Sequence, residues 1–240
     1  MPDHLAFAAV VVAAGSSSRF ANGKKEYRIL DGKPVLAHSL SLFLDMPGCM
    51  AVVAVVPPHG RSLAEQVLGD EFLARYADRL LLAEGGLQRA DSVRNGLQAL
   101  VPHQPPLVLV HDGARPWASR ILVERVLTAL GQQYANGVYP QSPLDALSVI
   151  PGIQPTDTIK RVDGSGMVVE HPARSMLRAV QTPQGFPFHA LLSVACASPS
   201  ASASASVTDD AEAWSAAGGR VLVVEGERSN TKITFVEDLA

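Results

Sequence analysis

The sequence alternates short apolar runs with segments of helical periodicity, and this alternation constrains the fold more than any other feature. Residues 7–13 read Phe-Ala-Ala-Val-Val-Val-Ala and carry no polar side chain, which is typical of a strand buried on both faces. Further strands are expected at 51–56, 80–82, 107–110, 221–224 and 232–234, and helices at 34–44, 61–79, 91–100, 120–130 and 209–217. Such alternation predicts an α/β fold, a mostly parallel sheet with helices on both faces.

This topology also predicts where a ligand binds. In open α/β sheets, ligands lie beyond the carboxyl ends of the strands. Segments 15–19, 85–92 and 111–116 each follow a predicted strand directly. We therefore expect these three segments to form one cleft.

Composition and charge narrow the class of protein. The 240 residues are 47% hydrophobic and 18% charged, which fits one domain spanning 1–240 with a sizeable core. The net charge of -3 offers no general attraction to nucleic acid or anionic membranes, so local Lys and Arg must hold any anionic ligand. The start of the sequence lacks a basic leader, and no apolar run approaches the roughly 20 residues that cross a bilayer. We therefore expect a cytoplasmic enzyme.

Two segments break the alternation. Residues 139–169 contain four prolines among apolar side chains, which predicts either a protruding strand pair used in dimerisation or a long irregular loop. We place this arm at about 137–172. Residues 198–206 consist of Ser, Ala and one Pro, which predicts a mobile surface loop.

The first predicted strand ends in a candidate anion site. Residues 13–19 read Ala-Ala-Gly-Ser-Ser-Ser-Arg, where Gly15 lets the backbone approach a triphosphate and successive N–H groups can surround it. Arg19, Lys24 and Lys25 would add positive charge against a leaving pyrophosphate. The loop matches neither the Walker nor the dinucleotide-binding pattern. A plain turn with solvated charges is the alternative.

The segment after the strand at 80–82 suits the reading of a base. Gly85 and Gly86 free the backbone for close contact, and Asp91 and Ser92 open the next helix. Their side chains could bind a base edge. Asp and Ser are also favoured helix caps, so a purely structural role is the alternative.

The segment 110–116 reads Val-His-Asp-Gly-Ala-Arg-Pro, so that a buried strand ends in Asp112. This carboxylate is a candidate Mg²⁺ ligand, because magnesium takes few protein carboxylates together with phosphate oxygens. An ion pair with Arg115 that holds the turn is the alternative. We expect His111 to be a packed or hydrogen-bonded residue and not a general base.

These segments, taken in order, resemble the 2-C-methyl-D-erythritol 4-phosphate cytidylyltransferase family of the non-mevalonate isoprenoid pathway. The matching motifs are Ala-Ala-Gly-x-x-x-Arg, Lys-Glu-Tyr, Gly-Gly-x-x-Arg-x-Asp-Ser-Val, His-Asp-Gly-Ala-Arg-Pro, Asp-Thr-Ile-Lys-Arg, Gln-Thr-Pro-Gln-Gly-Phe, Thr-Asp-Asp and Asn-Thr-Lys-Ile-Thr. The resemblance implies a Rossmann-like nucleotidyltransferase core, an arm that forms a homodimer, and a requirement for CTP and Mg²⁺. The implied products are CDP-methylerythritol and pyrophosphate.

The resemblance also implies roles for individual residues. The CTP-binding set is Ala13, Ala14, Gly15, Ser16, Arg19, Lys25, Gly86, Arg89, Asp91, Ser92, Asp112 and Ala114, with Asp112 as the metal ligand. The set for the acceptor phosphate is Arg115, Thr158, Arg174, Thr182 and Lys232, the arm residues reaching in from the partner subunit. The set expected to act in catalysis is Arg19, Lys25, Arg174 and Lys232.

Several points stay open at the level of sequence. The stretch before Lys25 lacks the proline common in the family, so that Lys24 competes with Lys25 for the catalytic role. The chain stops at 238–240 where relatives continue into a helix, which suggests a trimmed chain or one half of a fusion with the later cyclase of the pathway. The rival functions are a ribitol-5-phosphate cytidylyltransferase and a non-catalytic nucleotide-binding protein.

Overall fold

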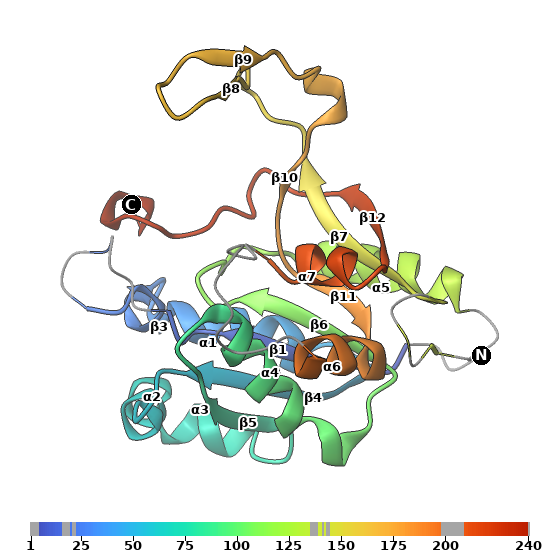
Figure 1. Ribbon diagram of the computed structural model, residues 1–240. Helices are drawn as coiled ribbons and strands as arrows, with labels where there is room; N and C mark the ends of the chain where they lie inside the picture. The colour runs from blue at the N-terminus through green and yellow to red at the C-terminus, as the bar shows by residue number, and fades with distance from the viewer. Residues whose placement is uncertain are drawn as a thin grey trace.

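The computed structural model describes residues 5–15, 20, 23–134, 139–140, 142, 145–197 and 209–239, and the statements below concern these residues. An eight-stranded mixed sheet forms the centre, helices cover it, and an arm projects from one end (Figure 1). The predicted loop at 198–206 lies outside the described residues.

The sheet has a parallel half and a mixed half. Its strands are β1 (Phe7–Val12), β4 (Cys49–Val56), β5 (Leu80–Glu84), β6 (Leu107–Asp112), β7 (Leu147–Ile153), β10 (Ala179–Val180), β11 (Gln184–Pro187) and β12 (Arg220–Glu225). Strands β5, β4, β1 and β6 are parallel neighbours, β11 is antiparallel to β6, and β7 carries β12 in parallel. The predicted mostly parallel sheet is confirmed.

Helices lie on both faces of the sheet, as predicted. The helices are α1 (Val35–Leu44), α2 (Arg61–Leu68), α3 (Asp70–Arg75), α4 (Arg89–Ala99), α5 (Arg120–Gln133), α6 (Phe188–Ala197) and α7 (Asp210–Ala216). Strand β1 sends Phe7, Ala9 and Val11 into the core under α1, α2 and α5, while Ala8 and Val10 face α4, α6 and α7. An entirely apolar strand is therefore required here.

One expected helix and one expected strand differ in the structure. The helix expected over 61–79 is broken into α2 and α3 at Gly69, whose φ of 81° no continuous helix can contain. The strand expected at 232–234 is absent, because these residues join no sheet and are held by side-chain contacts described below. The short remaining elements are η1 (Lys25–Tyr27), β2 (Ile29–Leu30), β3 (Lys33–Pro34), η2 (Val101–His103) and η5 (Val236–Leu239).

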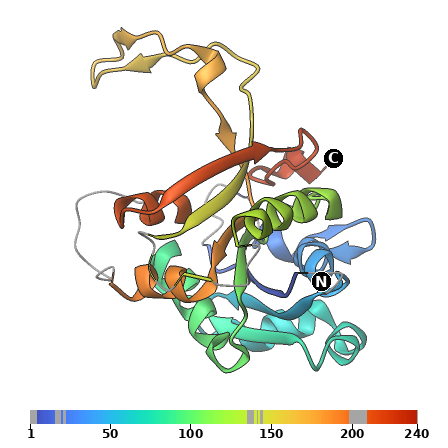
Figure 2. The same cartoon turned by 90° about the vertical axis from the view of Figure 1, so that its right-hand side faces the viewer.

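The arm is shorter than the expected 137–172. Its expected first part contains β7, which lies in the core sheet: its backbone pairs with β11 and β12, and most of its residues are buried. The projecting part runs between β7 and β10 and holds the hairpin β8 (Arg161–Val162) and β9 (Val168–Glu170), followed by η4 (Arg174–Met176). Figure 2 shows this part standing away from the sheet and its helices.

Among the described helices, none combines the length and the apolar character that crossing a membrane requires. The cytoplasmic location stays a prediction.

A glycine in α4 offers a test of the packing between this helix and the sheet. A Cβ at Gly96 would lie 2.5 Å from Val10 Cγ1 and 2.9 Å from Val55 Cγ2, both in the core. We expect Gly96→Ala to lower the free energy of unfolding by about 1–3 kcal/mol in urea titrations, although alanine favours helices. The control is Gly131→Ala in α5, where a Cβ would meet the movable end of Leu5. An equal or higher stability for Gly96→Ala would contradict this packing.

Candidate functional site

A cavity of about 410 Å³ opens at the carboxyl ends of the parallel strands. Its lining residues come from the end of β1, from the three segments expected to meet there, from Phe20 and η1, and from the C-terminal segment: Val12, Ala14, Gly15, Phe20, Lys25, Glu26, Gly86, Leu87, Gln88, Arg89, Ser92, Asp112, Ala114, Lys232 and Thr234. The predicted common cleft is therefore confirmed for the described residues. Ser16 and Arg19 lie outside them, and Ala13 is fully buried behind the wall.

Paired glycines allow two walls of this cavity to approach closely. A Cβ at Gly85 would lie 2.4 Å from the Cβ of Ala14, and one at Gly86 would lie 2.3 Å from the Cβ of Asp91. Neither distance is sterically possible, so any side chain at 85 or 86 would push the segments apart. The glycines thus bring the turn after β1 against the beginning of α4.

The first turn of α4 uses Asp91 and Ser92 for its own structure. The Gln88 N–H donates to Asp91 Oδ2 at 3.1 Å, and Arg94 Nη2 donates to Asp91 Oδ1 at 2.7 Å. Ser92 Oγ accepts from the Gly86 N–H and donates to the Gln88 carbonyl, each at 3.2 Å. The N-cap residue of α4 is thus Gln88, and Asp91 takes part in the capping from the third position of the helix; Asp91 does not line the 410 Å³ cavity, whereas Ser92 does.

Asp112, at the end of β6, is the electrostatic centre of the site. Lys232 Nζ donates to its Oδ2 at 2.8 Å, and Arg89 Nη2 and Arg115 Nε each lie 3.7 Å from its carboxylate. Burial alone would raise the pKa of Asp112, but Lys232 and Arg89 outweigh it and hold the pKa well below its usual range. The carboxylate is thus ionised at neutral pH.

Arg89 connects this centre to α7. Its Nη2 lies 2.8 Å from Asp210 Oδ2, and Asp210 belongs to the Thr-Asp-Asp motif. Burial alone would lower the pKa of Arg89, yet the carboxylates of Asp210 and Asp112 raise it, so the guanidinium stays charged. The Thr-Asp-Asp motif alone gives Asp210 no role, because no local pattern shows that the start of α7 reaches Arg89 at the start of α4.

A second cavity of about 210 Å³ adjoins the first. It is lined by Arg89, Asp112, Arg115, Val180, Gln181, Thr182, Gln184, Asp209 and Lys232. Both cavities share Arg89, Asp112 and Lys232. The Asp112–Lys232 pair therefore marks the junction between two ligand-sized spaces.

The structure separates the two neighbouring lysines. Lys25 lines the 410 Å³ cavity, and its Nζ donates to the Ile233 carbonyl at 2.7 Å. Lys24 is not among the lining residues, and its Nζ donates to the Ala13 carbonyl at 2.8 Å. Burial lowers the pKa of Lys24. Lys25 faces the space where a ligand would lie, and Lys24 holds the end of β1.

His111 is fully buried and hydrogen-bonded through both ring nitrogens, as expected. Its Nε2 lies 3.2 Å from the Arg115 carbonyl, and because a carbonyl only accepts, this nitrogen carries the proton. Its Nδ1 lies 3.0 Å from Thr182 Oγ1. Thr182 Oγ1 also accepts from the Asp112 N–H at 3.1 Å. Burial lowers the pKa of His111 to about 4, so the ring is neutral and joins both ends of the 111–115 turn.

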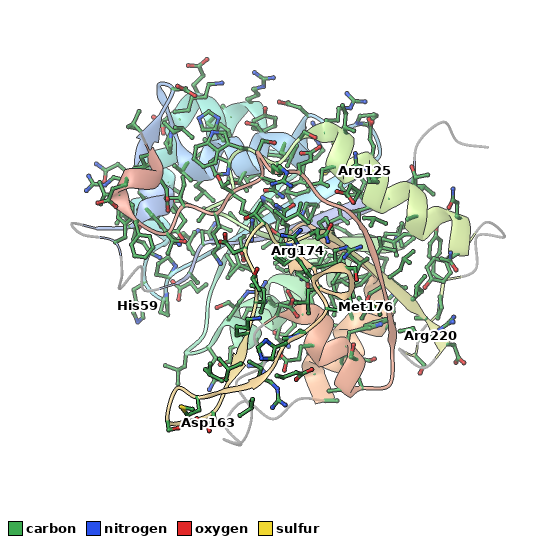
Figure 3. The ribbon with its side chains drawn as sticks, turned by 90° about the horizontal axis from the view of Figure 1, so that it is seen from above. His59, Arg125, Asp163, Arg174, Met176 and Arg220 are labelled. Carbon is green, nitrogen blue, oxygen red and sulfur yellow. The ribbon has the colours of Figure 1, made fainter. Side chains whose placement is uncertain are left out.

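The structure does not bring Arg174 or Thr158 to the two cavities of the same chain. Arg174 begins η4 on the arm, and its Nη1 donates to the Thr156 carbonyl at 2.9 Å. It lines a separate hollow with Gln154, Pro155, Thr156 and Arg228. In Figure 3, Asp163 marks the tip of the arm, and Arg174 and Met176 lie on its returning limb.

Metal-ligating side chains do not gather in the described part of the chain. No group of three or more His, Cys, Asp and Glu residues converges there. Asp112 is the carboxylate at the junction of the cavities, where its Oδ2 is bonded to Lys232 and Arg89 stands 3.7 Å from its Oδ1. A metal ion at this junction would take one carboxylate ligand, Asp112, and its other oxygen ligands from a bound substrate.

Comparison with known proteins gives consistent matches along the chain. The sequence profile described as "IspD: 2-C-methyl-D-erythritol 4-phosphate cytidylyltransferase" matches residues 7–240. A Rhodospirillum rubrum protein described as "Bifunctional enzyme IspD/IspF" is 39% identical over 97% of this chain and 55% of its own length. A Rhodopseudomonas palustris protein of the same description is 40% identical over 97% and 54%. The chain thus spans about half the length of these relatives.

Two solved structures share the fold. The 2-C-methyl-D-erythritol 4-phosphate cytidylyltransferase of Thermus thermophilus is 33% identical, with a TM-score of 0.70 over 96% of this chain and 94% of its own. The 4-diphosphocytidyl-2C-methyl-D-erythritol synthase of Anaerococcus prevotii is 27% identical, with a TM-score of 0.79 over 98% and 95%. The α/β fold expected from the sequence is the fold of these structures.

The contacts of Thr182 predict a stability difference between two small substitutions. Thr182→Val keeps the shape but leaves His111 Nδ1 and the Asp112 N–H without their buried partner, which should cost about 1–3 kcal/mol. Thr182→Ser keeps the hydroxyl and should lose less than about 1 kcal/mol. Urea unfolding measures both values. Equal losses would contradict the prediction, because the lost hydroxyl of Thr182→Val would then cost no more than the lost methyl group of Thr182→Ser.

Proposed function

The chain belongs to the 2-C-methyl-D-erythritol 4-phosphate cytidylyltransferase family, and we propose that it transfers CMP from CTP to methylerythritol phosphate in the non-mevalonate route to isoprenoid precursors. A phosphate oxygen of the acceptor attacks the α-phosphorus of CTP, the bond to the β-phosphate breaks, and pyrophosphate leaves. The observation that carries the proposal is the junction of two cavities at Asp112 and Lys232, where Arg89 and Arg115 add positive charge.

The sizes and linings of the cavities support this assignment of the two substrates. CTP would occupy the 410 Å³ cavity, with its triphosphate beside Ala14, Gly15 and Lys25 and its base toward Gly86 and Ser92. The acceptor would occupy the 210 Å³ cavity, with its phosphate between Arg115 and Lys232. The roles predicted for Ser16 and Arg19 on the triphosphate stay predictions.

The chemistry requires positioning and charge compensation more than proton transfer. The acceptor phosphate is already an anionic nucleophile, so that no general base is needed. Neutral, buried His111 is turned toward the Arg115 carbonyl and Thr182, which suits a structural role. Lys25, Arg89 and Lys232 would hold two mutually repelling anions in line and stabilise the charge that grows on pyrophosphate.

A divalent cation fits this donor set with Asp112 as its protein ligand. Mg²⁺ commonly uses one or two carboxylates and takes its other oxygens from phosphates and water. The ionised carboxylate of Asp112 lines both cavities, so it can reach a triphosphate bound in the larger one. When bound, the cation would neutralise phosphate charge and favour departure of pyrophosphate.

We further propose that two copies of the chain pair through the arm. The arm exposes Ile159, Val162, Met167, Val168, Val169 and Met176, more apolar surface than such a small hairpin would leave in water. Arg174 and Thr158 line neither of the two cavities in their own chain. In a homodimer they would complete the acceptor site of the other copy.

The decisive test is a transfer assay with a choice of acceptors. Purified protein, CTP and Mg²⁺ should release pyrophosphate with methylerythritol phosphate and at least about 100-fold less with ribitol 5-phosphate, a discrimination of about 2.7 kcal/mol. Removing divalent cations with EDTA should abolish release, and added Mg²⁺ should restore it. Preference for the ribitol acceptor would assign the rival function. CTP binding without turnover would indicate a non-catalytic protein.

The surroundings of the two lysines predict which of them acts on the triphosphate. Lys25→Met should lower kcat by about 10²–10³, the usual cost of losing one group that stabilises transition-state charge. Lys24→Met is the matched comparison, with a smaller loss, because its ammonium is bonded to the Ala13 carbonyl outside the cavity. Steady-state kinetics of both variants measure the difference. The reverse order would assign the catalytic role to Lys24.

A further inference from the structure

The segment that carries Lys232 has no regular structure to hold it. Between the end of β12 at Glu225 and the start of η5 at Val236, a stretch that the structure describes throughout, no residue joins a helix or a strand. Lys232 nevertheless places its ammonium 2.8 Å from Asp112, which is 120 residues away in sequence. Some other contacts must fix the backbone of this segment.

Gln181, just after β10, supplies four of these contacts. Its Nε2 donates to the carbonyls of Glu227 at 2.7 Å and Asn230 at 3.2 Å. Its Oε1 accepts from the Glu227 N–H at 3.0 Å and from Asn230 Nδ2 at 3.4 Å. The Gln181 N–H in turn donates to the Pro151 carbonyl of β7 at 2.8 Å, so the side chain is anchored to the core sheet.

Asn230, two residues before Lys232, completes the connection. Its side chain is fully buried, and its Nδ2 donates to the Thr182 carbonyl at 2.9 Å. Its own carbonyl accepts from Arg115 Nη1 at 2.7 Å. On the other side of Lys232, the Ile233 N–H donates to the Ala114 carbonyl at 2.9 Å. Lys232 is therefore flanked by two anchored residues.

We propose that Gln181 and Asn230 form an amide clamp that positions Lys232 at the junction of the two cavities. Gln181 must be an amide, because it donates to two carbonyls and accepts from the Glu227 N–H, while Asn230 donates its Nδ2 to Gln181 Oε1 and to the Thr182 carbonyl. Lys232 is 40% exposed in its side chain, and a flexible lysine loses much rotamer entropy when it is held in one place. A fixed backbone on both sides limits the positions that its ammonium can reach. Gln181 and Asn230 are positioning residues, not catalytic residues.

The test compares Gln181→Met with a matched control. Methionine has the length of glutamine but cannot form the four contacts, and the Gln181 side chain borders the 210 Å³ cavity, from which water can reach the freed groups. Gln66→Met, on the exposed face of α2, makes the same chemical change away from the site. We expect Gln181→Met to lower kcat/KM for the acceptor by at least about tenfold and Gln66→Met to leave it unchanged; tenfold is about 1.4 kcal/mol.

A double-mutant cycle separates positioning from general loss of structure. In a Lys232→Ala background, Gln181→Met should cost less than about threefold, because the group that it positions is gone. A tenfold loss in both backgrounds would show that Gln181 acts independently of Lys232 and would overturn the proposal. Asn230→Ala removes the contact with Thr182 and provides a second variant for the same cycle, which carries the test if Gln181→Met does not fold.

The kinetic tests of the clamp rest on the proposed function. A measurement without substrate tests the clamp independently of that function. Hydrogen exchange of the peptide over 226–234 should be at least about tenfold faster in Gln181→Met or Asn230→Ala than in the wild type, while peptides of α2 stay unchanged. Unchanged exchange would refute the clamp. Faster exchange with normal kcat/KM would refute its role in positioning Lys232. A wild type that fails to turn over would instead refute the proposed function.

Discussion

The site depends on one buried carboxylate and the cations that surround it. Asp112 lies at the end of a buried, largely apolar strand, where an isolated charge would be expensive to bury. Lys232 at 2.8 Å and the guanidinium groups of Arg89 and Arg115 at 3.7 Å compensate for that burial; Lys232 and Arg89 reach Asp112 from distant segments, and Arg115 from the same turn. The carboxylate therefore organises the cations as much as they stabilise it. Together they create a junction where two anions can be brought close.

Other features bring these groups within reach of one another. Gly85 and Gly86 remove the side chains that would keep the start of α4, and with it Arg89, away from the end of β1. Neutral His111 and Thr182 tie both ends of the turn that carries Asp112 and Arg115. None of these residues carries a charge that could bind a substrate. They set the positions of residues that do.

Features that depend on neighbouring residues could be predicted from the sequence, and features that depend on contacts between distant residues could not. Strand β1 and the cleft at the strand ends were predicted, because burial on both faces of a strand is visible in consecutive residues. The helix expected over 61–79 and the strand expected at 232–234 were wrong. A single glycine with positive φ breaks the former, and the latter is an irregular segment bound by distant side chains. The arm boundary was misplaced because β7 contains a proline and still pairs within the sheet.

The sequence by itself determined the class of fold, because the alternation of strands and helices is visible in local periodicity. It also determined the edge of the sheet where the site lies and the residue types at that edge, because the segments that follow the strands can be read directly. The tertiary structure decided which of two adjacent lysines faces the cavity, that Asp91 takes part in capping a helix, and that Asp210, Gln181 and Asn230 support the site. Such contacts join residues up to 208 positions apart, as between Lys25 and Ile233. Their geometry is set by how the strands and helices pack, and no local pattern records it.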